Sequence, residues 1–278
     1  METPRPFPGS YNDIDWNLLW QQARKQKSWQ SKSSTDWDKK AASFAKRNQR
    51  SPYVSLFLEQ LPLERSMSVL DVGCGPGTLA LPLAKRVDRV TCLDYSSVML
   101  DLVRQATEKE HLDGIRMVNC SWEDDWEQRG VGCHDIAIAS RSIGVHDLRG
   151  ALQKLNDHAN RFVFVTDRIS PTPFDPEAFS AIGREFNAGP DYIYTANCLY
   201  SMGIHPSITI LGLERDFCFS TMEEAFDSYA WMFQNLSSIE KNNLEEYIRS
   251  RIISSNKHQI IVRRKHPPRW AMIHWKKE

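Results

Sequence analysis

Residues 68–96 read SVLDVGCGPGTLALPLAKRVDRVTCLDYS and carry the strongest structural signal in the chain. A short apolar run leads into three glycines at alternate positions. A helical pattern, a second apolar run and an acid follow. Apolar runs that alternate with helical segments are typical of parallel strands joined by crossover helices. A glycine loop after the first strand lets the backbone approach a ligand closely. The stretch therefore predicts a nucleotide-like ligand on an α/β sheet.

The same alternation of strands and helices continues to residue 168 and then stops. We expect strands near 67–72, 89–94, 115–119, 134–140 and 161–167, and helices near 77–86, 96–110 and 147–159. A Pro-bounded helical insert is expected at 170–206, followed by a strand near 207–213, helices near 221–234 and 237–253, and short strands in QIIVRR and RWAMIHW. Residues 1–50 are expected to form a helical arm or cap, and residues 51–278 a ligand-binding domain that contains the insert.

Composition describes an ordinary globular protein. The 278 residues are 41% hydrophobic and 25% charged, with no net charge, so no general attraction to nucleic acid is expected. No apolar run approaches the roughly 20 residues of a membrane span, and the N-terminus lacks a signal peptide pattern. Six cysteines are spread singly without a C-x-x-C pair, which argues against a zinc site and against disulfides. The expectation is a cytoplasmic protein with no metal and no membrane association.

Three features of the glycine loop bear on its ligand. Asp71 precedes the loop, where a carboxylate would repel a pyrophosphate and attract an ammonium group. Pro76 removes one N–H donor that a phosphate would need. Asp94 ends the second strand and can accept hydrogen bonds from two ribose hydroxyls. The dinucleotide pattern G-x-G-x-x-G puts Thr78 or Ala80 at its last position, so a dinucleotide oxidoreductase stays open as an alternative.

Two segments resemble the cofactor-binding half of the class I S-adenosylmethionine-dependent methyltransferases, and more narrowly methyltransferase types 11 and 25. They read LDVGCGPGTLALPLA and VTCLDYSSVMLDLVRQA. The resemblance covers residues 35–168. It implies a Rossmann-like, doubly wound, seven-stranded sheet that is mostly parallel with one antiparallel edge strand. It also implies that S-adenosyl-L-methionine is the cofactor and S-adenosyl-L-homocysteine the product. TDWDKKAASFAKR, residues 35–47, is similar to the segment that often lies over this cofactor.

The resemblance places the methionine part of the cofactor at Asp71 and the glycine loop, the ribose at Asp94, and the adenine beside Tyr95 and Met99. The chain departs from the family after the third strand, where CSWED replaces Gly-Asp-Ala-Glu. Trp122 could stack on the base there, or it could anchor the core. The predicted cofactor-binding residues are Asp71, Gly73, Cys74, Gly75, Gly77, Asp94, Tyr95, Ser96, Met99, Ser121, Trp122, Glu123 and Ser140.

The acceptor is expected beyond the ends of the fourth and fifth strands, which read IASRSIGVHD and FVTDRI. His146 is a candidate base and Arg141 a candidate catalytic or clamping residue, although each could be structural. Aromatic residues of the insert, together with the apolar face of a helix over 13–24, could close over the acceptor. The predicted substrate residues are Trp20, Arg168, Tyr192, Tyr194 and Tyr200.

The sequence thus favours a methyltransferase acting on a small molecule, as a monomer or homodimer. One alternative is an RNA or protein methyltransferase that uses the basic segment 24–50. This segment contains nine Lys or Arg residues and only two Asp. Another is a cofactor-binding regulator without turnover. The absence of an [ND]-P-P-[FYW] motif after the fourth strand disfavours a nucleic-acid substrate.

Overall fold

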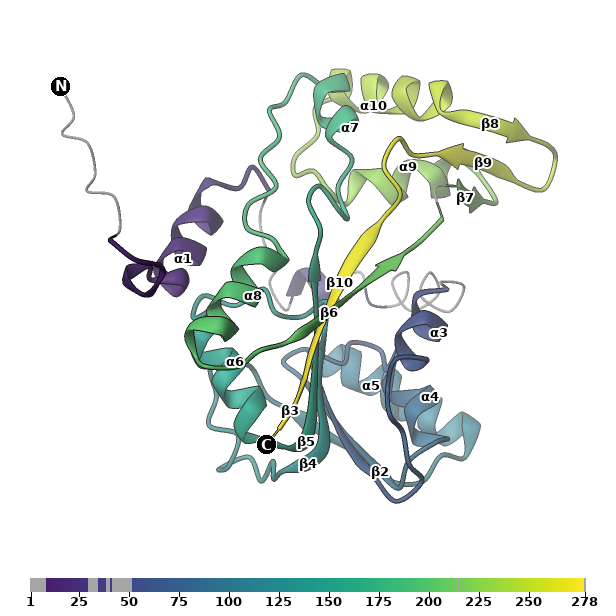
Figure 1. The fold of residues 1–278 in the computed structure, drawn as a ribbon. Helices are drawn as coiled ribbons and strands as arrows, with labels where there is room; N and C mark the ends of the chain where they lie inside the picture. Colours follow the sequence, from purple (N-terminus) through teal and green to yellow (C-terminus); the bar gives the residue numbers. More distant parts are fainter. Residues whose placement is uncertain (1–8, 30–34, 39–40, 42–51, 215, 278) are drawn as a thin grey trace.

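The main sheet carries seven strands in the order β3-β2-β1-β4-β5-β10-β6 (Figure 1). This is a computed structural model, and it describes residues 9–29, 35–38, 41, 52–214 and 216–277. The strands are β1 (Ser68–Val72), β2 (Arg89–Asp94), β3 (Ile115–Asn119), β4 (His134–Ser140), β5 (Ala159–Arg168), β6 (Ser207–Gly212) and β10 (Arg269–Lys276). The pairs among β1–β5 are parallel, and β10 runs antiparallel to β5 and to β6. The predicted seven-stranded, mostly parallel fold with one antiparallel strand is confirmed. That strand lies one place in from the edge.

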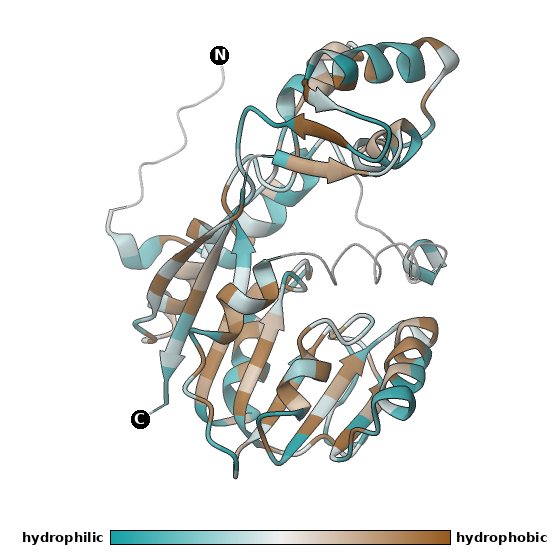
Figure 2. Ribbon diagram, turned by 90° about the vertical axis from the view of Figure 1, so that its right-hand side faces the viewer, coloured by the Kyte–Doolittle hydropathy of each residue, from teal (hydrophilic) through white to brown (hydrophobic). Residues whose placement is uncertain are grey.

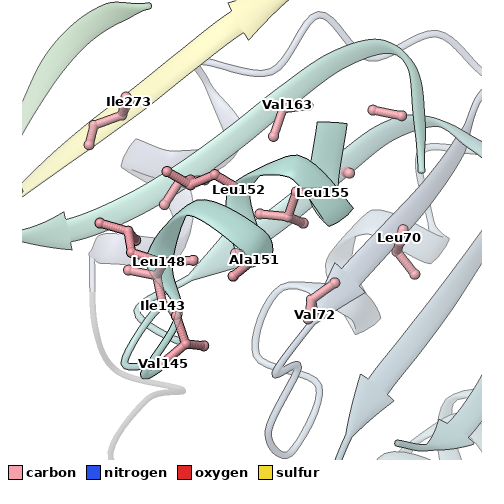
Figure 3. Packing of buried hydrophobic residues seen from close by; sticks show 14 of the residues in the cluster. Leu70, Val72, Ile143, Val145, Leu148, Ala151, Leu152, Leu155, Val163 and Ile273 are labelled. Atoms are coloured by element: carbon pink, nitrogen blue, oxygen red, sulfur yellow. The ribbon is translucent and has the colours of Figure 1, made fainter. Parts of the chain in front are cut away.

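Helices cover both faces of this sheet. One face carries α1 (Trp16–Gln26), α6 (Leu148–Asp157) and α8 (Tyr192–Ser201), and the other carries α3 (Tyr53–Leu58), α4 (Ala80–Ala84) and α5 (Ser97–Glu110). All five residues of β1 are buried, which explains why a strand covered on both faces reads as a continuous apolar run. In Figure 3, Leu148, Leu152 and Leu155 of α6 point toward the sheet.

Short polar side chains cap several of the helices. Asp15, Ser96 and Asp147 accept hydrogen bonds from backbone N–H groups in the first turns of α1, α5 and α6. Each bond satisfies an N–H donor that has no partner within the helix. The predicted helix over 77–86 is reduced to the five residues of α4, because turns occupy the chain before Ala80.

A small lobe has its own sheet and its own core. Its strands pair in the order β7-β9-β8 and are β7 (Asp216–Phe219), β8 (Ile252–Ser255) and β9 (Ile260–Arg263). Its helices are α7 (Pro176–Ala181), α9 (Met222–Ala230) and α10 (Ser238–Ser250). Figures 1 and 2 show this lobe apart from the main sheet. The chain enters it after β5 and again after β6, and returns at β10, so the lobe joins the sheet at the carboxyl end of β5.

The inserted material therefore extends beyond the expected 170–206. It also includes residues 216–263, and the sequence did not predict β7 or β8. These two strands have four residues each and are largely unburied, so they carry no buried apolar run or long alternation. QIIVRR and RWAMIHW do form strands, but β9 belongs to the small lobe and β10 to the main sheet.

The N-terminal helix α1 packs on α8 and α6. A 3-10 turn, η1 (Tyr11–Asp13), precedes it. Trp20 is 2% exposed, and its indole N–H donates to the carbonyl of Val145 at 2.9 Å. Trp16 and Trp20 both meet the ring of Tyr194 edge-on, with centroids 6.4 Å apart. The predicted packing of this helix against the insert is present.

Of the described helices, none is long and apolar enough to cross a membrane. All six cysteines are free thiols, with four buried and two exposed.

Candidate active site

The glycine loop, residues 73–77, lies between the carboxyl end of β2 and the segment that follows β4. The N–H groups of Gly73 and Cys74 donate to the carbonyl of Leu93 at 2.7 and 3.0 Å. On the other side, the hydroxyl of Ser142 donates to the carbonyl of Val72 at 2.6 Å. Gly73 has φ of +69°, and a Cβ there would lie 2.4 Å from the Cβ of Ser142. Only glycine fits this position, because a side chain would be strained and would also collide.

Gly73→Ala is expected to destabilise the protein by about 1–3 kcal/mol more than Gly183→Ala does. Gly183 is a matched control, since its φ is +76° but a Cβ there would meet nothing within 4 Å. The difference between the two variants isolates the collision with Ser142. Urea denaturation measures the free energy of unfolding of both variants. Equal losses of stability would show that Ser142 moves aside without a cost in free energy.

Asp71 is a buried carboxylate directly beneath this loop. It is 2% exposed, and its Oδ2 has no hydrogen-bond partner among the described residues. Burial, together with the nearby charge of Asp94, raises the pKa of Asp71 to about 7. A buried oxygen without a donor is costly, and a cationic ligand would offset that cost.

Asp94 ends β2 and connects the loop to α5. Its carboxylate accepts from the N–H of Gly75 at 2.8 Å and from the N–H of Ser96 at 2.9 Å. Each oxygen keeps a lone pair that could accept from a ribose hydroxyl. Burial raises the pKa of Asp94. The hydroxyl of Ser96 donates to Asp38 at 2.5 Å, so residues 35–38 reach this site as the sequence predicts.

These residues fit S-adenosylmethionine. Asp71, Asp94 and Asp38 place three carboxylates around one loop, an arrangement suited to a ligand with an ammonium, a sulfonium and a ribose diol. The same charges oppose a pyrophosphate. Asp71 could hold the ammonium and Asp94 the ribose hydroxyls.

The ends of β4 and β5 carry a second polar cluster, on the side away from β2. The hydroxyl of Tyr53, from α3, hydrogen-bonds with Ser140 Oγ at 2.7 Å and with Thr166 Oγ1 at 2.8 Å. Arg141 follows with φ of 58°, and its N–H donates to Thr166 Oγ1 at 2.9 Å. The sequence analysis did not identify Tyr53. Its only signal was a tyrosine within the apolar segment that precedes β1.

Comparison with known proteins agrees with this geometry. Residues 69–161 match the family described as a methyltransferase domain. A putative methyltransferase from Bacillus halodurans has the same fold, with a TM-score of 0.56 at 14% identity, over 81% of this chain and 98% of that one. The chain belongs to the class I S-adenosylmethionine-dependent methyltransferases. Its cofactor is S-adenosylmethionine.

Two relatives of this methyltransferase align over most of its length. A Haemophilus influenzae protein described as uncharacterized is 35% identical over 243 residues, which are 86% of this chain and 88% of that protein. A ubiquinone biosynthesis O-methyltransferase from Coxiella burnetii is 26% identical over 185 residues, 62% of this chain and 72% of that protein.

The residues predicted to border the adenine gather at the start of α5 and after β3. Tyr95 is 42% exposed, and burial of its hydroxyl, followed by the charges of Asp94 and Asp38, raises its pKa to about 12. Met99 is buried beneath the α5 cap. Cys74 is buried behind the loop, and Gly77 closes its turn with an N–H bond to the Cys74 carbonyl at 3.2 Å.

The CSWED segment is held against the rest of the protein by hydrogen bonds and packing. Trp122 donates its indole N–H to the carbonyl of Ser142 at 3.1 Å and packs against Trp126, which supports the interpretation as a core anchor. The N–H of Ser121 donates to Asp124 at 2.9 Å. Glu123 is exposed.

Several predicted substrate residues make packing contacts within the protein. Trp20 and Tyr194 pack α1 against α8, and Tyr192 packs against the same core, because these helices need an apolar contact to stay folded. Tyr200 is 51% exposed and contacts the rings of Tyr11 and His205. Aromatic composition alone could not separate core from pocket.

Arg168 contacts the insert, and His146 precedes α6. Arg168 donates its guanidinium to the carbonyl of Ala188 at 2.7 Å and to that of Pro190, so it fastens the insert rather than standing free as a clamp. His146 is exposed beside Asp147, the cap of α6. This is the structural position that the sequence analysis left open for it.

Proposed function

We propose that this methyltransferase transfers a methyl group from S-adenosylmethionine to a small-molecule acceptor held over the ends of β4 and β5. The glycine loop and Asp94 support a cofactor site at the ends of β1 and β2. The acceptor then belongs on the other side of the loop, beside Ser140 and Arg141. Ser142 packs on Gly73, so these two halves adjoin directly.

The observation that carries the proposal is a cover formed by the chain itself. The N–H of Ser28 donates to the carbonyl of Asn187 at 3.0 Å, and the indole N–H of Trp29 donates to the carbonyl of Ala188 at 2.9 Å. Arg168, at the end of β5, binds the same Ala188 carbonyl. The N-terminal arm is thus fastened to the insert beside the end of β5. Such a cover suits a small acceptor, since a polymer needs an open groove.

The basic arm gives less support to an RNA substrate. Arg24 Nη1 lies 3.8 Å from the Cβ position of Gly144, so this guanidinium lies against the protein's own loop. Burial, together with the charges of Arg24 and Arg168, lowers the pKa of Lys27 to about 8. Residues 30–34, 39–40 and 42–50 of the arm lie outside the described residues. The Coxiella burnetii relative, named for ubiquinone biosynthesis, also supports a small acceptor.

Alignment of the acceptor with the methyl group of the cofactor accounts for most of the catalysis in this proposal. The sulfonium of the bound cofactor supplies an electrophilic methyl group. The chain's part is to align the acceptor and exclude water. Tyr53, Ser140 and Thr166 form a fixed hydroxyl network at the acceptor side. Burial raises the pKa of Tyr53, so its hydroxyl stays protonated, and its bonds to Ser140 and Thr166 hold the ends of β4 and β5 in place beside the proposed acceptor site.

A labelling experiment tests the proposal. Purified protein is incubated with methyl-labelled S-adenosylmethionine and an extract divided into small-molecule, RNA and protein fractions. We expect the label to enter the small-molecule fraction, with no change after nuclease or protease treatment. Label that enters mainly RNA or protein would contradict the proposal. We also place the reaction in the cytoplasm, where the free thiols stay reduced.

A further inference from the structure

Arg141 is a half-buried cation without an acidic partner. It directly follows β4 and keeps some exposure to solvent. Among the described residues no carboxylate forms an ion pair with it. Its guanidinium carbon lies 4.2 Å from the ring centre of Tyr53 and 5.7 Å from that of Trp270. Burial lowers the pKa of Arg141, yet an arginine remains charged in a protein.

The position of the Arg141 side chain lowers the stability of the folded protein. A partly buried charge without a counter-ion is less well solvated than a charge in water, and stacking on aromatic rings compensates only in part. The backbone of Arg141 also has φ of 58°, a left-handed conformation that is strained for a residue with a side chain. Strain and an unpaired charge at the carboxyl edge of a sheet are typical of ligand-binding positions.

The direction of the side chain points to the acceptor rather than to the cofactor. The N–H of Arg141 binds Thr166 of β5, and the guanidinium reaches the ring of Trp270 on β10. In the sheet, β5 and β10 lie on the side of β4 opposite to β1 and β2. We propose that Arg141 binds a negatively charged group of the acceptor, a carboxylate or a phosphate. This inference rests on the proposed function.

Further charged side chains lie near the end of β5. Arg24, Lys27 and Arg168 come close enough to influence one another electrostatically, although like charges repel. The nearby Asp167 is engaged already, because it accepts from Thr195 at 2.7 Å and from the N–H of Arg168 at 2.7 Å. Asp191 caps α8. Both signs of charge therefore lie near the end of β5, and the anionic acceptor is inferred from Arg141 itself.

Binding measurements test this without knowledge of the true acceptor. Acetate, benzoate and phenyl phosphate are titrated by calorimetry into protein saturated with S-adenosylhomocysteine, with benzamide as the neutral match for benzoate. The proteins are wild type, Arg141→Met, Arg141→Lys and Arg104→Met. Arg104 is a remote control, a surface arginine paired with Asp101 on α5.

We expect wild type and Arg104→Met to bind at least one of the anions and to show no detectable binding of benzamide. Arg141→Met should bind that anion at least about tenfold more weakly, Arg141→Lys should retain part of the affinity, and S-adenosylhomocysteine should bind all four within about threefold. The proposal is overturned if wild type binds none of the anions, or if Arg141→Met binds them equally well. A tenfold loss of S-adenosylhomocysteine affinity in Arg141→Met would also overturn it, because the anion would then be the cofactor's own carboxylate. Methyl transfer to RNA would refute the proposed function and leave these binding results unchanged.

Discussion

Asp94→Ala is expected to weaken S-adenosylhomocysteine binding by roughly 30- to 700-fold, a loss of about 2–4 kcal/mol. The carboxylate could accept from two ribose hydroxyls, and it already holds the N–H groups of Gly75 and Ser96. Removing it deletes the direct contacts and also releases the glycine loop. Calorimetric titration of both proteins measures the change.

The same substitution should lower stability. Asp94 is 6% exposed, and the two backbone bonds that it accepts are worth about 1–3 kcal/mol together. Asp88→Ala is a suitable control, because Asp88 is an exposed acid just before the other end of β2. A loss of affinity below about twofold in Asp94→Ala would show that Asp94 does not bind the ribose.

Asp71→Asn should weaken S-adenosylhomocysteine binding by roughly 10- to 150-fold, as expected for one charge-assisted hydrogen bond of about 1.5–3 kcal/mol. The wild-type affinity should also fall as pH drops below about 7, because Asp71 must lose its proton to hold an ammonium group. In Asp71→Asn that dependence should largely disappear. Calorimetry between about pH 6 and pH 8 compares the two proteins.

Without cofactor, the stability effect has the opposite sign. The folded-state pKa of Asp71 is raised to about 7, so its protonation stabilises the fold at low pH, and this contribution is lost as pH rises through that value. Asp71→Asn should therefore melt at a higher temperature than wild type near pH 8. A variant that melts lower and binds S-adenosylhomocysteine unchanged would show that Asp71 has a structural role only.

The sequence predicted the cofactor half well, because its signals are local. Strand β1, Asp71 and Gly73 follow one another in the chain, and β2 ends at Asp94. Each parallel strand, covered on both faces, leaves a run of apolar residues that can be recognised without any tertiary contact. The strands from β1 to β6 were expected within two residues of their observed bounds.

The acceptor half depends on contacts between distant segments. Arg141 follows β4, Tyr53 lies on α3 and Trp270 lies on β10, and no spacing in the sequence links them. Tyr194 and Trp20 suggested an apolar pocket, but both serve to pack α1 on α8. The left-handed backbone of Arg141 was equally unpredictable, because an arginine in a loop carries no such signal.

A crystal structure with S-adenosylhomocysteine would test the central claim most directly. The account predicts the amino group within hydrogen-bond distance of Asp71, both ribose hydroxyls on Asp94, and the sulfur facing the side where Ser140 and Arg141 lie. A ligand whose ribose lies away from Asp94, or whose amino group finds no partner in Asp71, would contradict it.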